Sequence, residues 1–475
     1  MLLTLAASLL LAGLSAGCAT YRPAPLPPID AASGTQAPDF DRLTVAASGL
    51  SHALLPPVAL DVNDGLSPDE AAVVAVLNNP DLRVVRDARG EAQAQLLAAG
   101  LLPNPVLTAE FDRTQGAVAE STVDPFVVSL EESLNELITR SARRTAAKAQ
   151  LASVDLGIAW HEWQVAQAAR LAAVRLAMLG RRLDLVLAEA KFEQETVAVL
   201  ETAVKRHDAT VEDLGVHRSA LASLRQQAGD LEKLSTRERS RFNRILGLPP
   251  SSDIEIALDR DAGEDFAALP ANPVLVRIAT SARLDLQALQ LGYAAQEARV
   301  RRAVLNQFPS ISIGIVRQRN EAAVQFLGGF VSLGLPIFRR NQGVIAIEQA
   351  TRRRLRDEYA ARISAIRADV AELADVDRIL GRQIATARRS VAQIAAIEEA
   401  ERRGVLSGDV DRLAWQQVRT SLVELKIKLA ALVQARLESR VALTTATGGP
   451  VPLTALSEGS VLPDREPSGS ENVDR

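Results

Sequence analysis

The sequence predicts a mainly α protein with a small β part, built from two copies of one structural unit. Three observations support this prediction: long stretches with apolar residues three and four positions apart, an internal repeat, and four short segments that alternate between apolar and polar residues. Hydrophobic residues make up 47% of the 475 residues, but aromatic residues make up only 3%. Because Ala, Leu and Val supply the apolar surface, the composition is typical of long packed helices rather than of a compact enzyme.

The first 17 residues predict a signal peptide. Residues 2–17 form a run of apolar and small residues that is shorter than the ~20 residues needed to span a bilayer comfortably, and the run ends directly before Cys18. The segment LSAGC (14–18) resembles a bacterial lipobox, in which the cysteine thiol accepts a diacylglycerol. We therefore expect a lipid anchor on Cys18. The alternative is a plain cleaved signal peptide that leaves a free thiol.

Residues 18–66 and 451–475 flank the main body of the chain. The first segment is rich in Pro, Ala, Gly and Ser, and it predicts a lipidated N-terminus followed by an extended linker. The second segment is polar without periodicity and predicts a disordered tail. No segment after the signal peptide approaches ~18 consecutive apolar residues, so we expect no transmembrane helix.

Between these segments, one structural unit occurs twice, at residues 67–250 and 271–450. Three landmarks of the first unit recur 204 residues later: Asp81 as Asp285, Pro105 as Pro309 and Phe126 as Phe330. Each unit is predicted to hold a short helix, a second helix, two strands, a long helix, a turn and a final helix. In the first unit we expect the helices over 68–78, 81–101, 133–208 and 211–246; the second long helix is expected over 341–403. At 1.5 Å per residue the two long helices measure roughly 110 and 95 Å.

The helices carry apolar stripes at coiled-coil spacing. One such stripe lies on the last helix and consists of Val418, Leu422, Leu425, Leu429 and Leu432. Alanine beside these stripes allows helices to approach closely on a second face. Helices with two packing faces can form a closed ring, so the sequence is compatible with a helical barrel.

The four alternating segments have the period of half-buried strands. On their apolar faces we expect Leu107, Phe111, Ile311, Ile313 and Ile315. Such a face packs either against helices in a soluble sheet or against lipid in a membrane barrel. Because the helices already satisfy each other as a coiled coil, we favour lipid. Four strands cannot close around a lumen, so a barrel would need several chains.

No pattern in the chain indicates catalysis or tight binding of a cofactor or metal ion. His161 and Glu162 begin like a zinc-protease helix, but Val165 occupies the position of the second histidine. One cysteine and two methionines supply no soft-metal site. The net charge of −4 gives no signal of nucleic-acid binding. We therefore predict a protein that is not an enzyme and that needs no cofactor.

Two turns join the long helices to the helices that follow them, at residues 206–213 and 402–411. In the second turn, Gly404 and Gly408 loosen the backbone, and Ser407 or Asp409 is predicted to cap the next helix. Capping gives these residues a structural role that is compatible with a functional one.

These features resemble the TolC-like outer-membrane efflux factors, which form the outer membrane efflux protein family. The resemblance covers roughly residues 67–450. It rests on the repeat and on three stretches: NNPDLRVVRDARGEAQAQLLAAGLLPNPVL (78–107), LGLPIFRRNQGVIAIEQA (333–350) and RRGVLSGDVDRLAWQQ (402–417). The phrase PIF (336–338) followed by RNQG (340–343) resembles the heavy-metal efflux branch of that family.

The resemblance implies a homotrimer. Each chain would give four strands to a twelve-stranded transmembrane β-barrel in the outer membrane, and its helices to a long coiled-coil α-barrel in the periplasm. The implied function is the exit duct of a tripartite efflux pump, which works with a periplasmic adaptor protein and an inner-membrane transporter. Small toxic compounds or metal ions would pass through it without catalysis. The alternative is a periplasmic adaptor lipoprotein with one coiled-coil hairpin, against which the duplicated strand pairs argue.

The resemblance also places the second turn at the periplasmic tip of the duct. The family narrows its lumen there with carboxylates and arginine bonds, which implies a gate role for Arg402, Arg403, Asp409 and Asp411. Adaptors dock at the same tip, which implies a docking role for Gly404, Val405, Leu406, Ser407 and Gly408.

Overall fold

The computed structural model describes residues 20–26, 28, 38–61, 63–114, 123–259 and 266–449. After helix α2 (Phe40–Ser48), the first half contains α3 (Pro68–Asn78), α4 (Pro80–Gly100), β1 (Val106–Phe111), β2 (Phe126–Ser133), α5 (Leu134–Lys205) and α6 (Val211–Leu246). The second half contains α7 (Asn272–Ala282), α8 (Leu284–Leu305), β3 (Ser310–Arg319), β4 (Gln325–Gly334), α9 (Gln342–Ser407) and α10 (Arg412–Thr447). Both halves have the same order of elements, and the predicted mainly α fold with a small β part is confirmed.

Local sequence signals account for the helix ends. Ser67 and Glu70 form a reciprocal capping box at the start of α3, and Pro68 occupies the first helical turn, where its missing N–H costs nothing. The helices α6 and α10 each end at a glycine in the left-handed conformation, Gly247 and Gly448. These residues start or end helices at points where the chain changes direction.

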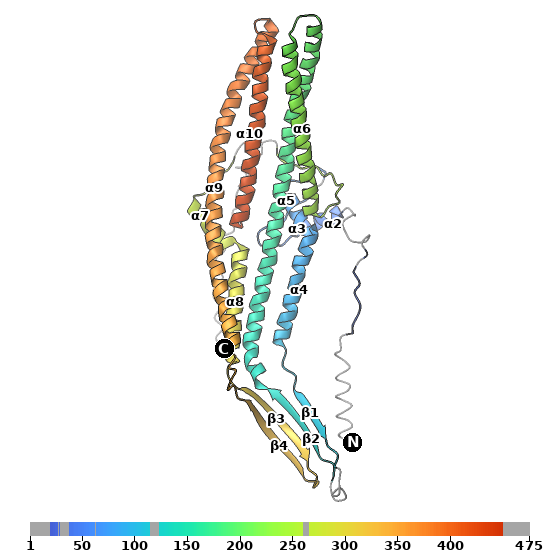
Figure 1. The fold of residues 1–475 in the computed structure, drawn as a ribbon, viewed down its shortest axis with the longest axis vertical. Helices are drawn as coiled ribbons and strands as arrows, with labels where there is room; N and C mark the ends of the chain where they lie inside the picture. Colours follow the sequence, from blue (N-terminus) through green and yellow to red (C-terminus); the bar gives the residue numbers. More distant parts are fainter. Residues whose placement is uncertain are drawn as a thin grey trace.

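Two long helices run along an elongated molecule, with the strands at one end and the helix turns at the other (Figure 1). The helix α5 has 72 residues and α9 has 66. The shorter helices stack end to end beside the long ones, and a hydrogen bond joins the two helix ends in each stack. Asn79 Nδ2 donates to the carbonyl oxygen of Ile245 at 2.8 Å where α4 meets α6, and Arg283 Nη1 donates to the carbonyl oxygen of Ala446 at 3.1 Å where α8 meets α10.

The helix α5 lies between two such stacks, in contact with α4 and α6 on one side and with α8 and α10 on the other. The helix α9 packs on the far side of the α8–α10 stack. At mid-height, α3 packs on α5 through a cluster that includes Val73, Val74 and Ala172. In the second half, α7 packs on α9 in the same way, with Leu275 against Ile366. The short helices thus form a belt across the middle of the long ones.

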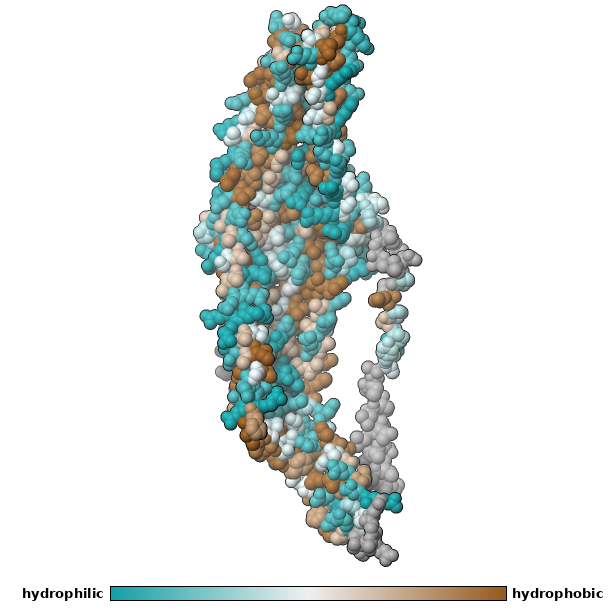
Figure 2. All heavy atoms as spheres, in the orientation of Figure 1, coloured by the Kyte–Doolittle hydropathy of each residue, from teal (hydrophilic) through white to brown (hydrophobic). Residues whose placement is uncertain are grey.

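The four strands form one antiparallel sheet in the order β1-β2-β3-β4. Many apolar residues are visible over this end of the molecule (Figure 2). Because β1 pairs with β2 and β4 pairs with β3, both outer strands present an edge without a partner in the chain as described. Among the described helices, none is long and apolar enough to cross a membrane.

Candidate functional site

The sheet places the predicted strand residues on one face. Directly paired residues point to the same side of a sheet, and the register pairs Leu107 with Leu130, Leu130 with Ile315, and Ile313 with Val331. By the same alternation, Phe111 and Ile311 lie on this face. The opposite face carries polar and small residues, among them Thr108, Ser129, Ser312 and Ser332.

None of the described residues covers the apolar face of the sheet. Leu107, Phe111, Ile313 and Ile315 are all exposed, and so are Leu327, Val331 and Leu333 of β4. Contiguous exposed apolar surface on a folded chain marks a contact with lipid or with protein. The structure therefore brings the five predicted residues together on a surface that needs a partner.

At the other end of the molecule, α9 continues to Ser407, so Arg402, Arg403 and Gly404 lie in its last turns rather than in the turn itself. A Cβ at position 404 would lie 2.4 Å from Cγ2 of Val410, so a larger residue there would force the Val410 side chain to move. The turn bends at Gly408, which has a φ of 85°. Leu406 is 77% exposed at this tip.

The predicted capping residue of α10 was wrong. Neither Ser407 nor Asp409 caps this helix; the cap is Asp411, whose carboxylate accepts from the backbone N–H of Leu413 at 3.2 Å. Ser407 Oγ instead lies 2.8 Å from the carboxylate of Asp409 and 3.0 Å from the carbonyl oxygen of Gly404, and its one hydroxyl proton can be donated to either. These short-range bonds hold the turn closed on itself and leave Asp411 as the residue that starts the returning helix.

Within one chain, the tip arginines and the tip carboxylates do not meet. Arg402 donates two hydrogen bonds to Glu399, at 3.0 and 2.9 Å, and Arg403 Nε lies 3.9 Å from the same carboxylate. The hydrogen bond from Arg402 lowers the pKa of the exposed Glu399 carboxyl. In the described chain, no ion pair joins either arginine to Asp409 or Asp411.

A polar contact that the sequence analysis did not identify joins the two halves of the chain below the tip. Glu189 and Glu193 lie one turn apart on α5 and are both buried. Arg419 of α10 approaches Glu189 at 3.4 Å, and His217 of α6 lies 2.5 Å from Glu193. Burial, with a smaller contribution from Glu193, raises the pKa of Glu189, although Arg419 opposes the shift. The only sequence signal was two glutamates at helical spacing within an otherwise apolar stripe.

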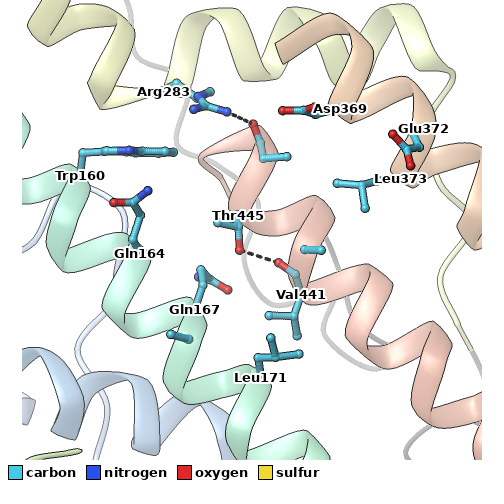
Figure 3. A pocket seen from close by; sticks show the side chains of 13 residues that line it. Trp160, Gln164, Gln167, Leu171, Arg283, Asp369, Glu372, Leu373, Val441 and Thr445 are labelled. Atoms are coloured by element: carbon cyan, nitrogen blue, oxygen red, sulfur yellow. Dashed lines mark hydrogen bonds between the residues drawn. The ribbon is translucent and has the colours of Figure 1, made fainter. Parts of the chain in front are cut away.

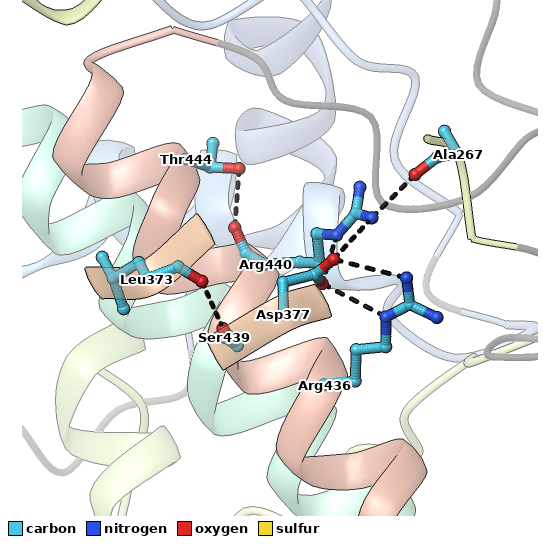
Figure 4. Close-up of polar contacts among 7 residues, drawn as sticks. All are labelled: Ala267, Leu373, Asp377, Arg436, Ser439, Arg440 and Thr444. Carbon is cyan, nitrogen blue, oxygen red and sulfur yellow. Dashed lines mark hydrogen bonds and ion pairs between the residues drawn. The ribbon is translucent and has the colours of Figure 1, made fainter. Parts of the chain in front are cut away.

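A buried ion-pair cluster fastens α9 to α10 at mid-height (Figure 4). Asp377 and Arg440 are each 1% exposed, and two hydrogen bonds join them at 2.6 and 3.0 Å. Arg436 donates to the same carboxylate at 3.2 and 3.3 Å. Arg440 also donates to the carbonyl oxygen of Ala267, in the segment that leads to α7. The cluster thus joins α9, α10 and the segment before α7.

Cys18 lies outside the residues that the structure describes, as do the predicted signal peptide and the tail from residue 451. In the described part of the chain, no three His, Cys, Asp or Glu side chains are grouped so that they could hold a metal ion. Glu162 of the zinc-protease-like phrase pairs with Arg86 and His52 instead.

Comparisons with known proteins agree with this architecture. Residues 275–449 match the model of a family described as outer membrane efflux protein. No curated protein is significantly similar to the chain. Solved structures of outer-membrane channels match the fold at low sequence identity, and these matches cover more of the chain than the family model does.

Three of these structures illustrate the match. CusC aligns with a TM-score of 0.66 and 19% identity, over 81% of this chain and 92% of that one. The outer membrane protein VceC from Vibrio cholerae has a TM-score of 0.65 and 15% identity, over 80% and 96%. The open state of the MtrE outer membrane channel from Neisseria gonorrhoeae has a TM-score of 0.66 and 14% identity, over 91% and 98%. Residues 275–449 are thus similar to the outer membrane efflux protein family, and most of the chain shares the fold of these outer-membrane channel structures.

Proposed function

We propose that this protein is the outer-membrane exit duct of a tripartite efflux pump. The observation that carries the proposal is the four-stranded sheet with one exposed apolar face and two free edges, attached to helices that are far longer than a globular domain. Three copies would join their sheet edges into a twelve-stranded barrel and their helices into a continuous tube. The barrel would sit in outer-membrane lipid, and the tube would extend into the periplasm.

In this proposal the duct is passive. It catalyses no reaction, and small toxic compounds or metal ions cross it from the periplasm to the outside. Energy comes from an inner-membrane transporter, and a periplasmic adaptor protein joins the two. We place adaptor docking at residues 404–408, which include the exposed Leu406. A lipid on Cys18 would add a second attachment to the membrane.

The alternative, a periplasmic adaptor lipoprotein, fits the structure less well. An adaptor of that kind has one coiled-coil hairpin, whereas this chain has two long helix pairs and a sheet to which both halves contribute two strands. The exposed apolar face of that sheet has no role in an adaptor. The duct accounts for both features.

The test compares two arginine substitutions at adjacent positions of β3. Ile313 lies on the apolar face and Ser312 on the polar face. Near the middle of a membrane barrel, Ile313→Arg should cost roughly 2–4 kcal/mol because it places a charge in lipid. Ser312→Arg should be mild because it faces water. Assembly is measured as the fraction of membrane-extracted trimer in detergent.

We expect a trimer that partitions with the outer-membrane fraction and loses assembly only in Ile313→Arg. A chain that stays in the aqueous fraction as a monomer would refute the duct. Equal assembly of both variants would show that the faces of the sheet are assigned wrongly.

A further inference from the structure

A groove of about 530 Å³ lies at mid-height, where the end of α10 meets the beginning of α8. The helix α5 forms one wall with Trp160, Gln164 and Gln167, and α9 forms the other with Asp369 and Glu372 (Figure 3). The groove exists because two helices that meet end to end leave a gap that a continuous helix would fill. We call it the junction groove. Its volume suits an organic molecule of drug size.

The junction groove is lined by a buried amide, that of Gln167, which makes no hydrogen bond to the described residues. Its side chain is 2% exposed, yet neither the amide nitrogen nor the amide oxygen has a hydrogen-bond partner in the structure. Figure 3 shows this amide on the α5 wall, beside the end of α10. A buried amide without partners is unfavourable, so a molecule that offers both a donor and an acceptor is favoured there.

The charges around the junction groove favour a cation. Arg283 is already engaged, because it donates to Asp285 at 2.9 and 2.8 Å and lies over the Trp160 ring at 4.6 Å. Asp369 and Glu372 lie one turn apart on α9, and neither has an ion-pair or hydrogen-bond partner among the described residues. Two unbalanced carboxylates on one wall therefore attract positive charge.

The groove opens on the face of the long helices that the belt leaves bare. On α5, Arg170 pairs with Asp69 of α3 at 2.7 Å, whereas Gln164 and Leu171 line the groove on a different side of the same helix. On α9, Ile366 packs in the core cluster with Leu275 of α7, whereas Asp369 and Glu372 lie on another side of the helix and line the groove, with Leu373 between the two sides. If three chains close into the proposed tube with the belt outside, this face is turned toward the lumen.

We propose that the junction groove binds amphiphilic organic cations as they pass through the duct. The inference rests on the proposed function and names a substrate class for it. The cationic group lies beside Asp369 and Glu372, the apolar body lies against Leu171 and Leu373, and a polar substituent reaches Gln167.

The test measures binding of ethidium, a planar organic cation, to the purified full-length protein in detergent by fluorescence anisotropy. We expect saturable binding. The double variant D369N/E372Q should weaken it about five- to tenfold, since each partly exposed charge pair contributes little alone. The control is Asp357→Asn, which removes an exposed carboxylate from the same helix outside the groove and should leave the affinity unchanged. Circular dichroism and the oligomeric state verify that every variant is folded.

Fluorescein, an anion of similar size, should bind at least tenfold more weakly than ethidium. Equal affinity of the double variant and the unmodified protein for ethidium would overturn the inference, as would equal binding of the two dyes. Conductance in planar bilayers separates this result from the proposed function. A protein that forms channels but does not bind ethidium saturably overturns the groove alone, whereas a protein that binds ethidium but forms no channel overturns the duct.

Discussion

Replacing Asp377 with alanine is expected to destabilise the helical part of the protein by about 3 kcal/mol, the lower end of the range for breaking a buried ion pair. Four hydrogen bonds from Arg436 and Arg440 converge on this carboxylate, at distances from 2.6 to 3.3 Å. The substitution leaves two guanidinium groups in a buried site without the carboxylate that balances their charge. Burial alone raises the pKa of Asp377, but the hydrogen bonds from both arginines outweigh it and leave the pKa below its usual 3.8.

The assay is thermal or urea unfolding of the detergent-solubilised protein, followed by circular dichroism. The control is Asp375→Ala, two positions away on α9, which breaks an exposed pair with Arg378 and should cost no more than about 1 kcal/mol. Replacing both Asp377 and Arg440 with apolar residues should recover part of the loss, because the charge and its partner are removed together. Equal destabilisation by Asp377→Ala and Asp375→Ala would refute the reasoning.

The same cluster predicts the direction of a pH effect. Because the pKa of Asp377 is lower in the folded protein than in the unfolded chain, its contribution is fully present above the unfolded value of 3.8. It is lost as the pH falls below 3.8 through the folded pKa. Asp377→Ala should therefore show a smaller loss of stability between pH 5 and pH 3 than the unmodified protein.

Three further predictions concern the tip, the polar contact below it and the N-terminus. Replacing both Asp409 and Asp411 with alanine should reduce the preference for cations in planar-bilayer recordings, because rings of carboxylates favour cations. Unchanged ion selectivity in intact trimers would mean that these residues act only in the turn and as the helix cap. Glu189→Gln should raise thermal stability at pH 7 but not at pH 4. Burial raises the pKa of Glu189, so the stabilising contribution of its protonated form is present below about pH 4.5 and is lost as the pH rises through the folded pKa. A gain in stability of equal size at both pH values would contradict this sign. Mass spectrometry of the mature N-terminus should find an acylated Cys18, and an unmodified thiol would rule out the lipid anchor. The Cys18→Ala variant should stay in the membrane fraction, because one lipid adds only part of the membrane attachment.

Much of the fold was predictable because it depends on neighbours in the sequence. The first long helix was expected over 133–208 and spans Leu134–Lys205. The second was expected to end at 403 but continues to Ser407, because Gly404 keeps helical geometry beside Val410 instead of breaking it. Strand faces followed from alternation alone, so the five apolar strand residues could be named before any pairing was known. In each case a signal within a few residues determines the backbone.

The contacts between elements could not be read in this way. Asp377 meets Arg440 63 positions later, and Glu189 meets Arg419 across the two halves of the chain. On a helix of about 70 residues, periodicity shows which residues share a stripe, but a shift of one residue between neighbouring helices changes every partner along it. That register is set by packing summed over the whole length of α5, α9 and α10. The sequence by itself therefore determined the helices, the strands and the repeat, whereas only the tertiary structure decided which buried charges pair and where the gap between α8 and α10 opens into a groove.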